Sequence, residues 1–312
     1  RALRLDEALA TIPAVSLFRR TSSLAANPTT QGISLRAIAP SGAGRTLVTL
    51  DGVPLNDPFG GWVIWLRVAP ESLSGLDVVR GAGAGPYGAG GLTGRADMPV
   101  GDAALSLRAS TWEEDRGSGL AGARANASGS SLSATLARQP PVDRPGWRLQ
   151  AWQTRSNLTN GSVAVAADRS TTTAANDQFH TPATGQGLNA AVRSTGVALA
   201  GGRLEWELGL DARSAEGETN ERSRNLGAGF TRSRRAGGET RVAGVYGEGA
   251  WRGGDWLLAG GLRLDHWSSE NGRRLERDLT TGLPTLDETD PDRSGTVTSA
   301  RFAVRRVLGQ DY

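Results

Sequence analysis

The feature that most restricts the fold of this chain is a glycine-rich stretch at residues 76–94, LDVVRGAGAGPYGAGGLTG. Glycine at this density suits a backbone that turns tightly and lies close against another surface. The residues before it have the mixed pattern of a small α+β domain, whereas from about Ala103 strand-like segments alternate with polar loops. We therefore predict two domains, residues 1–100 and residues 101–312, joined through this stretch.

The same stretch contains the spacing of a dinucleotide-binding fingerprint, Gly83-x-Gly85-x-x-Gly88. That fingerprint requires a strand before it and a helix that begins at its last glycine. Residues 76–80 supply the strand, but each glycine between residues 88 and 94 disfavours a helix by roughly 1 kcal/mol relative to alanine. A dinucleotide-binding protein or a soluble glycine-rich β enzyme is therefore only a rival interpretation.

Composition leaves two structural classes open. The 312 residues include no cysteine, which excludes disulfides and thiol chemistry, and no apolar run approaches the roughly 18 residues of a membrane-spanning helix. The chain is either a soluble β protein or a membrane β-barrel, whose alternating strands conceal their lipid-facing side from a hydropathy scan. All basic residues are arginine, the net charge is +3, and acidic residues are interspersed, which argues against a nucleic-acid-binding protein.

Alternation of apolar and charged side chains dominates the second domain. Leu208 and Leu210, for example, lie on the opposite face of their segment from Glu207 and Asp211. This period of two indicates half-buried strands, either in a sheet that faces water or in a barrel that faces lipid. About ten strands are predicted, at 103–112, 119–128, 131–138, 146–155, 160–166, 189–199, 203–213, 241–251, 255–267 and 296–307.

The connections between these predicted strands are long and short in turn. The longer ones are 113–118, 139–145, 167–188, 214–240 and 268–295, and the last three are polar loops that we expect to be solvated. Outer-membrane barrels have tight periplasmic turns and longer extracellular loops. A domain in the periplasmic mouth would send the first strand outward, which makes every long connection extracellular. The pattern favours a mainly β fold, a small α+β domain followed by a partial antiparallel transmembrane β-barrel.

Three blocks in the first hundred residues carry a more specific signal. They are GISLR at 32–36 with RTLVTLDGVPLND at 45–57, LDVVRG at 76–81, and YGAGG at 87–91. Their order and spacing resemble the plug domain of TonB-dependent outer-membrane receptors over about residues 5–100. The matching positions are Leu35, Asp51, Gly52, Pro54, Val79, Arg80, Gly81, Tyr87 and Gly88.

The resemblance has two departures, and local signals accompany it. Ala37 replaces a usual glycine, and Arg95-Ala96-Asp97 replaces an apolar strand end, which leaves the join between plug and barrel open. Leu5–Ala10 is predicted to be helical, 47–50 a strand, and Asp51-Gly52 a hairpin turn.

The resemblance implies a receptor in the outer membrane of a Gram-negative bacterium. It implies uptake of a scarce ligand, such as a ferric siderophore or a cobalamin, with energy from TonB and its inner-membrane complex. The family's signal peptide and TonB box would precede residue 1, and roughly half of a barrel wall would follow residue 312. A passive porin or adhesin without energy coupling is the alternative, and a TonB box upstream would separate the two.

Candidate ligand-binding residues follow from the family's substrate-facing plug loops, which correspond to 36–45 and 54–65. They are Arg36, Arg45, Asn56, Asp57, Phe59 and Trp62. Core packing of Trp62 and Trp65 is an equal alternative for those two rings.

Further candidates lie in the second domain. Arg222, Arg224, Arg232, Arg234 and Arg235 could form a cationic cluster for an anionic ligand or lipopolysaccharide phosphates. Trp112, Trp147, Trp152, Trp251 and Trp267 lie near predicted strand ends, as in an interfacial aromatic girdle, next to outer-membrane lipid.

No enzyme activity, cofactor or metal site is predicted. His180 and His266 have no second ligand nearby, and the chain has no cysteine nucleophile, no Gly-x-Ser-x-Gly elbow and no Walker lysine.

Overall fold

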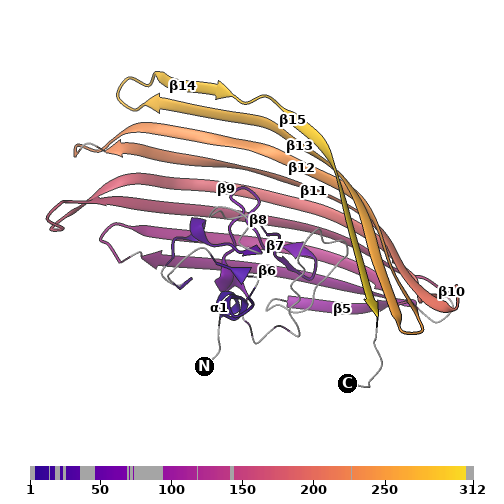
Figure 1. Ribbon diagram of the computed structural model, residues 1–312. Coiled ribbons are helices and arrows are strands. Elements are labelled where there is room, and N and C mark those ends of the chain that lie inside the picture. The colour runs from indigo at the N-terminus through magenta and orange to yellow at the C-terminus, as the bar shows by residue number, and fades with distance from the viewer. Residues whose placement is uncertain are drawn as a thin grey trace.

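The computed structural model describes residues 4–13, 15–17, 22–23, 26–35, 46–68, 70, 73, 94–117, 119–140, 144–225 and 227–306, and residues 94–100 by their backbone alone. A small N-terminal domain lies beside one large curved β-sheet (Figure 1). We call the described residues between 4 and 73 the plug region. The glycine-rich stretch up to residue 93 lies outside the described residues.

The plug region is built from short elements. Helix α1 spans Leu5–Ala10, as predicted, and the 3-10 helices η1 and η2 span Pro28–Thr30 and Trp65–Arg67. Strand β1 (Val15–Ser16) pairs with β2 (Ser34–Leu35), and β3 (Thr49–Leu50) pairs with β4 (Val53–Pro54). The strand predicted at 47–50 is therefore shorter than expected, because the chain enters it as an irregular segment.

One apolar core holds these short elements together. Leu5 and Leu9 lie one turn apart on α1, so both side chains reach the same side of the helix. They pack in a buried cluster with Val63 and Trp65. The cluster is completed by Ile33, Leu55 and Val68. Burial of side chains of this size contributes roughly 1.5–3 kcal/mol each.

The second part is one antiparallel sheet, which confirms the predicted mainly β fold. Its strands are β5 (Gly94–Val100), β6 (Ala103–Gly117), β7 (Arg124–Arg138), β8 (Gly146–Val165), β9 (Thr172–Arg193), β10 (Val197–Leu199), β11 (Gly202–Asn225), β12 (Phe230–Gly253), β13 (Trp256–Asp278), β14 (Pro284–Thr289) and β15 (Arg293–Arg306). Most strands pair with the next strand along the chain. The exceptions are β9, which pairs with β11 beside the short β10–β11 pair, and β15, which pairs with β13 as β14 does.

The sheet begins before residue 101. Strand β5 pairs with β6 along its whole length, from Gly94 opposite Ala109 to Val100 opposite Ala103. The unusual Arg95-Ala96-Asp97 segment is therefore a sheet strand. The position of the boundary between the two domains stays a prediction.

Two of the predicted strand breaks are wrong. The break at 129–130 falls inside β7, and the break at 156–159 falls inside β8. Polar and glycine residues suggested turns there, but in this sheet they occupy ladder positions, with Gly129 opposite both Trp112 and Ser156. The connection at 139–145 consequently lies at the opposite rim from the one predicted. Arg138 at its start pairs with Asp102 in the β5–β6 turn, with 3.1 Å between Nη1 and Oδ2.

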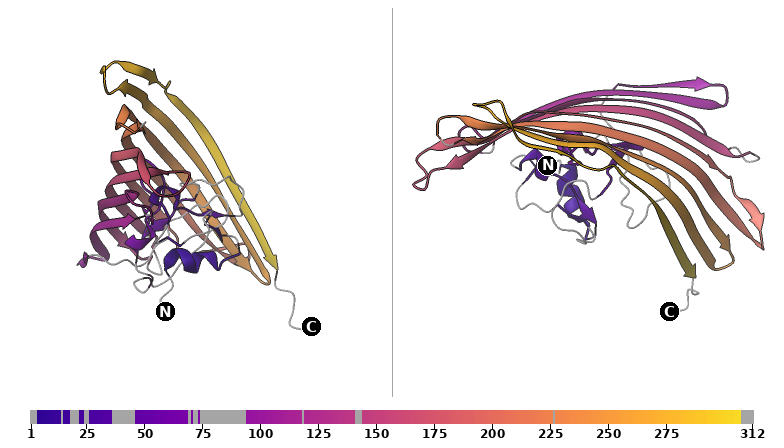
Figure 2. Two further views of the ribbon diagram at one scale, coloured as in Figure 1. Left: turned by 90° about the vertical axis from the view of Figure 1, so that its left-hand side faces the viewer. Right: turned by 90° about the horizontal axis from the view of Figure 1, so that it is seen from above.

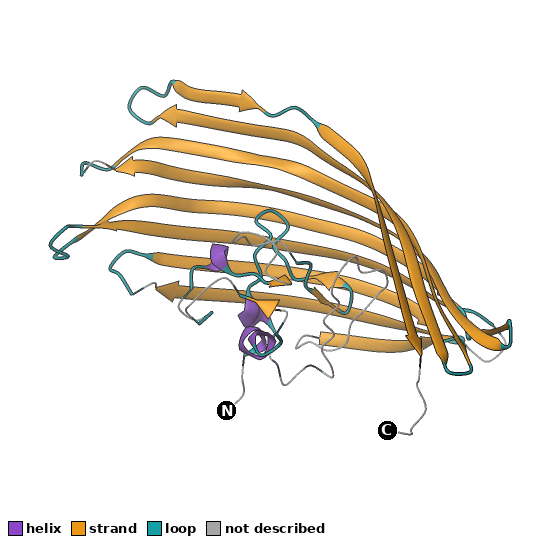
Figure 3. Ribbon diagram, viewed as in Figure 1, coloured by secondary structure: helices purple, strands orange, loops and turns teal. Residues whose placement is uncertain are grey.

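The three predicted long loops are also wrong, because most of their residues continue the strands. Residues 172–188 belong to β9, 214–225 and 230–240 to β11 and β12, and 268–278 to β13. The true connections at that rim are the short segments 118–123, 166–171, 226–229 and 279–283 (Figure 3). We call this end of the sheet the long-hairpin rim.

The two faces of the sheet differ in polarity. Leu208, Leu262 and Phe302 are 56%, 58% and 75% exposed on the convex face, while Glu207 on the opposite face of β11 is 4% exposed. The predicted alternation of these segments is therefore correct, with the apolar side outward. The plug region lies against the concave face (Figure 2).

Candidate functional site

The plug region meets the concave face of the sheet through two turns. One is the β3–β4 hairpin with Asp51 and Gly52 at its tip, and the other is the loop from Asn56 to Trp62. Because these turns carry the Asp51 and Asp57 contacts to the sheet, they fix the position of the plug region on the concave face. We treat this contact zone as the candidate functional site.

The hairpin turn is the one predicted from Asp51-Gly52. Both residues have positive φ, 52° and 85°, which matches the type I′ turn of two-residue hairpins. The Asp51 carbonyl accepts hydrogen bonds from Arg148 Nη2 at 3.0 Å and from Gln150 Nε2 at 2.9 Å on β8. Its carboxylate pairs with Arg108 on β6. A sequence signal for a turn thus also marks a point of attachment to the sheet.

Close contact with the sheet also favours glycine at position 52, in addition to its positive φ. A Cβ atom at this position would lie 2.8 Å from Gln150 Oε1 and 3.0 Å from Arg148 Nη2. The hairpin therefore approaches the sheet as closely as a main chain without a side chain allows.

The second turn is held together by its own polar side chains. Asn56 Oδ1 accepts from the Val48 amide at 2.8 Å, and Asn56 Nδ2 donates to the carbonyls of Thr46 and Gly61. Asp57 Oδ1 accepts from the amides of Phe59 and Gly60. These two predicted ligand-binding residues are thus used first to shape the loop that carries them.

Asp57 also joins the loop to the sheet. The Ser156 hydroxyl on β8 donates to Asp57 Oδ2 at 2.6 Å. Burial raises the pKa of the Asp57 carboxyl, and the donors Gly60, Ser156 and Phe59, together with Arg67, oppose that rise. Burial lowers the pKa of Arg67 to about 10, and the Asp57 charge opposes that fall. The two ionisable groups therefore stabilise each other's charge in a largely dry interface.

An apolar contact lies beside this polar one. Trp62, 8% exposed, and Ile64 pack with Ala127 and Leu158 of the sheet. Trp112 on β6 packs against the same cluster, and the Arg67 guanidinium lies 4.8 Å from the centre of its ring. The structure thus places Trp62 between plug region and sheet, while Trp65 lies in the core of the plug region.

The tip of the Asn56–Trp62 loop extends across the sheet beyond β8, to β9 and β11. Pro58 lies against Gly185 on β9, and Phe59 lies against Gly217 on β11. A Cβ atom at Gly217 would approach the Phe59 Cβ to 2.5 Å, so the absence of a side chain there makes room for the loop. Phe59 is still 36% exposed, so this predicted ligand-binding side chain keeps a free surface toward the long-hairpin rim.

A third group of contacts involves the segment before β2. Arg116 on β6 donates through Nη1 to the carbonyls of Ser23 and Ala26, at 2.6 and 2.5 Å. Asn27 Nδ2 donates to Asn160 Oδ1 on β8 at 3.1 Å. Residues of the sheet that hold the plug region, such as Arg108, Arg148 and Ser156, were missed from sequence. Their signal was the polar side of each alternating strand, which marks the concave face.

The predicted arginine cluster is not a single cluster. In the β11–β12 register, Arg234 and Arg232 stand opposite Glu221 and Ser223. Arg222, opposite Ser233, is on the other face of the hairpin, and Arg224 has a positive φ of 57° near the turn. Arg234 pairs with Glu221 at 2.6 Å, and Arg232 pairs with Glu276 and Asp278. Arg235 pairs with Glu218, so acidic residues offset this positive charge.

Arg222, on the convex face, has different partners. Its guanidinium lies 4.8 Å from the ring centre of Phe179 and 3.9 Å from Asp177 Oδ2. The expected cationic patch is therefore divided by the pleat, because residues from two paired strands share a face only in the correct register.

The predicted aromatic girdle is only partly correct in placement. Trp147 and Trp251 lie near strand ends and pair with convex-face residues Val192 and Leu204. Trp112, Trp152 and Trp267 instead lie on the concave face, in the middle of longer strands than were predicted. The error has the same origin as the wrong strand ends.

Several predicted site residues cannot be placed. Arg36, Arg45, Val79, Arg80, Gly81, Tyr87 and Gly88 lie outside the described residues. Of the remaining motif positions, Leu35 ends β2 and Pro54 ends β4. In the part of the chain that the structure describes, no three side chains of His, Asp or Glu converge as metal ligands. Nor does any described helix have the length and apolarity needed to cross a membrane.

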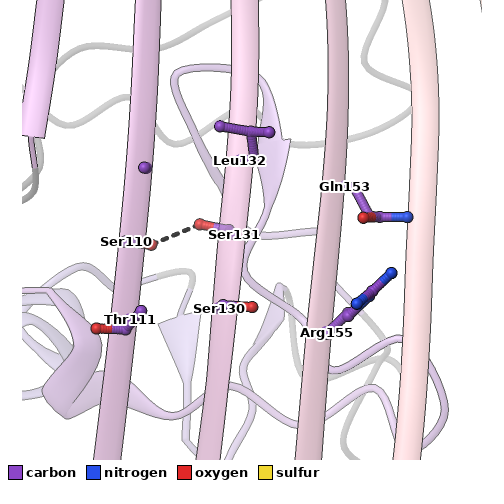
Figure 4. A pocket seen from close by; sticks show the side chains of 8 residues that line it. Ser110, Thr111, Ser130, Ser131, Leu132, Gln153 and Arg155 are labelled. Atoms are coloured by element: carbon purple, nitrogen blue, oxygen red, sulfur yellow. Dashed lines mark hydrogen bonds between the residues drawn. The ribbon is translucent and has the colours of Figure 1, made fainter.

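A shallow hollow of about 340 Å³ lies over β6, β7 and β8 and includes convex-face residues (Figure 4). Leu132 is on one side of it and Gln153 and Arg155 are on the other, while the Ser110 and Ser131 hydroxyls hydrogen-bond at 2.5 Å. On the convex face, the row from Ala109 through Leu132 to Gln153 is where apolar side chains give way to polar ones.

A curved antiparallel sheet with a small folded domain on its concave face defines the class of plugged β-barrels. The sequence profile described as TonB-dependent Receptor Plug Domain matches residues 1–95, and the profile described as TonB dependent receptor-like, beta-barrel matches residues 71–308. The chain therefore belongs to the TonB-dependent receptor family, an outer-membrane family, as the sequence motifs predicted.

Solved structures show the same fold. The unliganded ferric citrate transporter FecA matches with a TM-score of 0.64 at 13% identity, over 99% of this chain and 58% of that one. The ferric-catecholate import receptor Fiu from E. coli K12, in a closed form, matches with a TM-score of 0.51 at 11% identity, over 67% of this chain and 39% of that one. This chain thus spans 58% of the FecA chain. No curated protein matches the sequence.

Proposed function

We propose that the chain forms the plug and part of the wall of a receptor for TonB-energised uptake of a scarce ligand. The observation that carries this proposal is the docking of the plug region on the concave face, through Asp51 and Asp57. Such a domain blocks the passage until work is done on it. Energy delivered through TonB to the N-terminal side of the plug region would supply that work.

The ligand class that we propose first is a ferric siderophore or a related iron chelate, with cobalamin as the other candidate. The similar structures are those of a ferric citrate transporter and a ferric-catecholate receptor. Their low identities support the fold alone, so the choice among chelates depends on the experiment below.

The convex face supports a location in the outer membrane. Convex-face positions from Leu204 to Ala212 on β11 are all apolar. The convex-face positions from Trp256 to Leu264 on β13 also carry no polar side chain. About nine residues span about 27 Å of strand, and a tilt of about 40° reduces this to roughly 21 Å, close to the apolar band of outer-membrane barrels. We propose that lipid and lipopolysaccharide cover this band.

The orientation follows from the strands that continue beyond the band. Strand β11 has 24 residues, so its second half, with its partners, stands clear of the apolar zone on the long-hairpin rim. We propose that this rim is extracellular. Phe59 contacts Gly217 in this second half, which supports an outward-facing position of the Asn56–Trp62 loop.

The candidate ligand contacts are therefore the exposed face of Phe59 and the inward side of the long hairpins, including Arg232 and Arg234. Asn56, Asp57 and Trp62 would act indirectly, since they hold the loop and its docking surface. Arg36, Arg45, Arg222 and Arg224 stay predicted contacts without further support.

Uptake in a strain that lacks the gene, complemented with the full-length receptor, tests the proposal. Radiolabelled ferric citrate, ferric catecholates and cyanocobalamin would be supplied singly, with and without TonB. Uptake of one of them that disappears without TonB, while cell-surface binding persists, supports the proposal. Uptake that is indifferent to TonB indicates the passive porin, and no uptake of any ligand with retained cell adhesion indicates the adhesin.

A further inference from the structure

A pocket of about 500 Å³ lies beside the tip of the β3–β4 hairpin, toward the rim opposite the long hairpins. Its described lining includes four arginines, Arg108, Arg138, Arg148 and Arg193, but only two acidic residues, Asp51 and Glu207. The pocket thus carries an excess of positive charge on the concave face, where the dielectric constant is lower than in bulk water and charge has a stronger effect.

Two of these arginines are neutralised from within the sheet. Arg138 pairs with Asp102 at 3.1 Å, and Arg193 pairs with Glu207 at 2.7 Å. These pairs do not depend on the plug region, since all four residues belong to the sheet or its turns.

The other two arginines depend on Asp51. Arg108 pairs with the Asp51 carboxylate, and both side chains are largely buried, at 13% and 20% exposure. Arg148 donates to the Asp51 carbonyl at 3.0 Å, and no described carboxylate pairs with it. Gln150 donates to the same carbonyl at 2.9 Å, and its own Oε1 accepts from Asn189 at 2.8 Å, which fixes the orientation of the amide.

We propose that Arg108, Arg148 and Gln150 form an oxyanion site that Asp51 fills in the resting receptor, and that the site takes a small carboxylate-bearing ligand when the hairpin withdraws. Two guanidinium groups and one amide direct N–H donors at one residue: Arg108 contacts the Asp51 carboxylate, and Arg148 and Gln150 donate to its carbonyl. Clustered N–H donors of this kind bind carboxylates. The neighbouring pocket gives room for the rest of a ligand of about the size of citrate. The withdrawal rests on the proposed function, but the site itself does not.

The test frees the Arg108 side of the site by substitution instead of transport, while the main-chain carbonyl of residue 51 still accepts from Arg148 and Gln150. Asp51→Gly removes the carboxylate and keeps the turn, because glycine adopts the positive φ of this position. The full-length receptor is purified in detergent, and citrate binding is measured by titration calorimetry at constant ionic strength. We expect Asp51→Gly to bind citrate at least about tenfold more tightly than the wild type, as the exposure of a charge-assisted site predicts.

Two further variants make the result specific. Asp51→Gly combined with Arg108→Gln should return citrate affinity to the wild-type level. Asp57→Ala removes another plug carboxylate that contacts the sheet, but its sheet partner is Ser156 instead of an arginine, so no gain is expected. Asp51→Asn keeps the size of the side chain and removes its charge, so it should give a smaller gain in the same direction.

The proposal is overturned if neither Asp51 variant gains citrate affinity, or if the gain survives Arg108→Gln, or if Asp57→Ala shows the same gain. None of these measurements uses TonB or uptake. Failure of the oxyanion site is therefore distinct from failure of the proposed function.

Discussion

The Ser156 hydroxyl on β8 donates a hydrogen bond of 2.6 Å to Asp57 Oδ2 in the plug region. Asp57 is buried, and its other carboxylate oxygen already accepts from two loop amides. One hydroxyl therefore completes the solvation of a carboxylate across the boundary between two parts of the molecule.

Ser156→Ala should loosen the Asn56–Trp62 loop. Loss of the donor leaves a buried carboxylate oxygen without its partner, which costs about 1–3 kcal/mol. Hydrogen exchange of the loop amides, followed by mass spectrometry, measures the effect as faster exchange. Ser162→Ala, at an exposed position of the same strand, is the matched control. Equal exchange in the two variants would contradict the assigned role of Ser156.

The stability of the docked plug region should depend on Asp57 protonation. Burial raises its pKa, so the folded form binds the proton more tightly than the unfolded form. The contribution is complete below the ordinary aspartate pKa, near 3.8, and is lost as pH rises through the raised folded value. Asp57→Asn keeps an acceptor oxygen and abolishes the titration. The urea midpoint of plug unfolding should therefore fall with rising pH in the wild type more steeply than in the variant; identical slopes would refute this.

Gly52→Ala should release the β3–β4 hairpin from the sheet. The substitution strains a residue with φ of 85° and pushes a Cβ atom toward Gln150, so we expect a loss of about 2–3 kcal/mol. Gly52→Asn tests which cause dominates, since asparagine tolerates positive φ but still carries Cβ. If contact dominates, both variants show faster trypsin cleavage of the plug region; wild-type cleavage in the asparagine variant would assign the effect to strain alone.

Trp62→Ala should weaken docking more than ligand contact. The ring is buried among Ile64, Ala127 and Leu158, and removal of a buried tryptophan side chain costs about 3–5 kcal/mol. Phe59→Ala is the comparison, because Phe59 retains an exposed face. We expect trypsin sensitivity in the first variant, and weaker cell-surface ligand binding with intact docking in the second. The reverse assignment would restore Trp62 as a direct ligand contact.

Leu208→Arg should impair membrane insertion. Leu208 lies within the apolar convex band, where an arginine costs about 2–4 kcal/mol at the bilayer midplane. Ser214→Arg lies on the same face of the same strand, in the polar row with Gln186 and Arg241. Heat-modifiable gel migration after folding into lipid vesicles should be reduced in the first variant and retained in the second. Equal folding of both would place the membrane elsewhere.

Sequence alone predicted the parts of the fold that local physics determines. Helix Leu5–Ala10 follows from its apolar spacing, and the Asp51-Gly52 turn from its tolerance of positive φ. The strands around Leu208 and Leu262 follow from the alternation of apolar and polar side chains. The family motifs then supplied the arrangement of the two domains, which short-range patterns do not contain.

The errors arose where alternation stops although pairing continues. Beyond Ala212 most side chains on both faces of β11 and β12 are polar, so these segments resemble loops in the sequence. Main-chain hydrogen bonds nevertheless extend the ladder to the Asn225–Phe230 pair. The candidate site was hidden for a related reason, because Arg108 and Ser156 acquire their roles only through a domain far away in sequence.

The hydrogen bonds and ion pairs between the plug region and the sheet that are described above all end on β6 or β8. Along β8 they run from Arg148 and Gln150 through Ser156 to Asn160, a distance of about 40 Å. A pull parallel to the strands loads these bonds together in shear, whereas a pull away from the sheet breaks them one after another, as in peeling. The force needed to detach the plug region therefore depends on direction. A pull away from the sheet detaches it at a smaller force than a pull parallel to the strands.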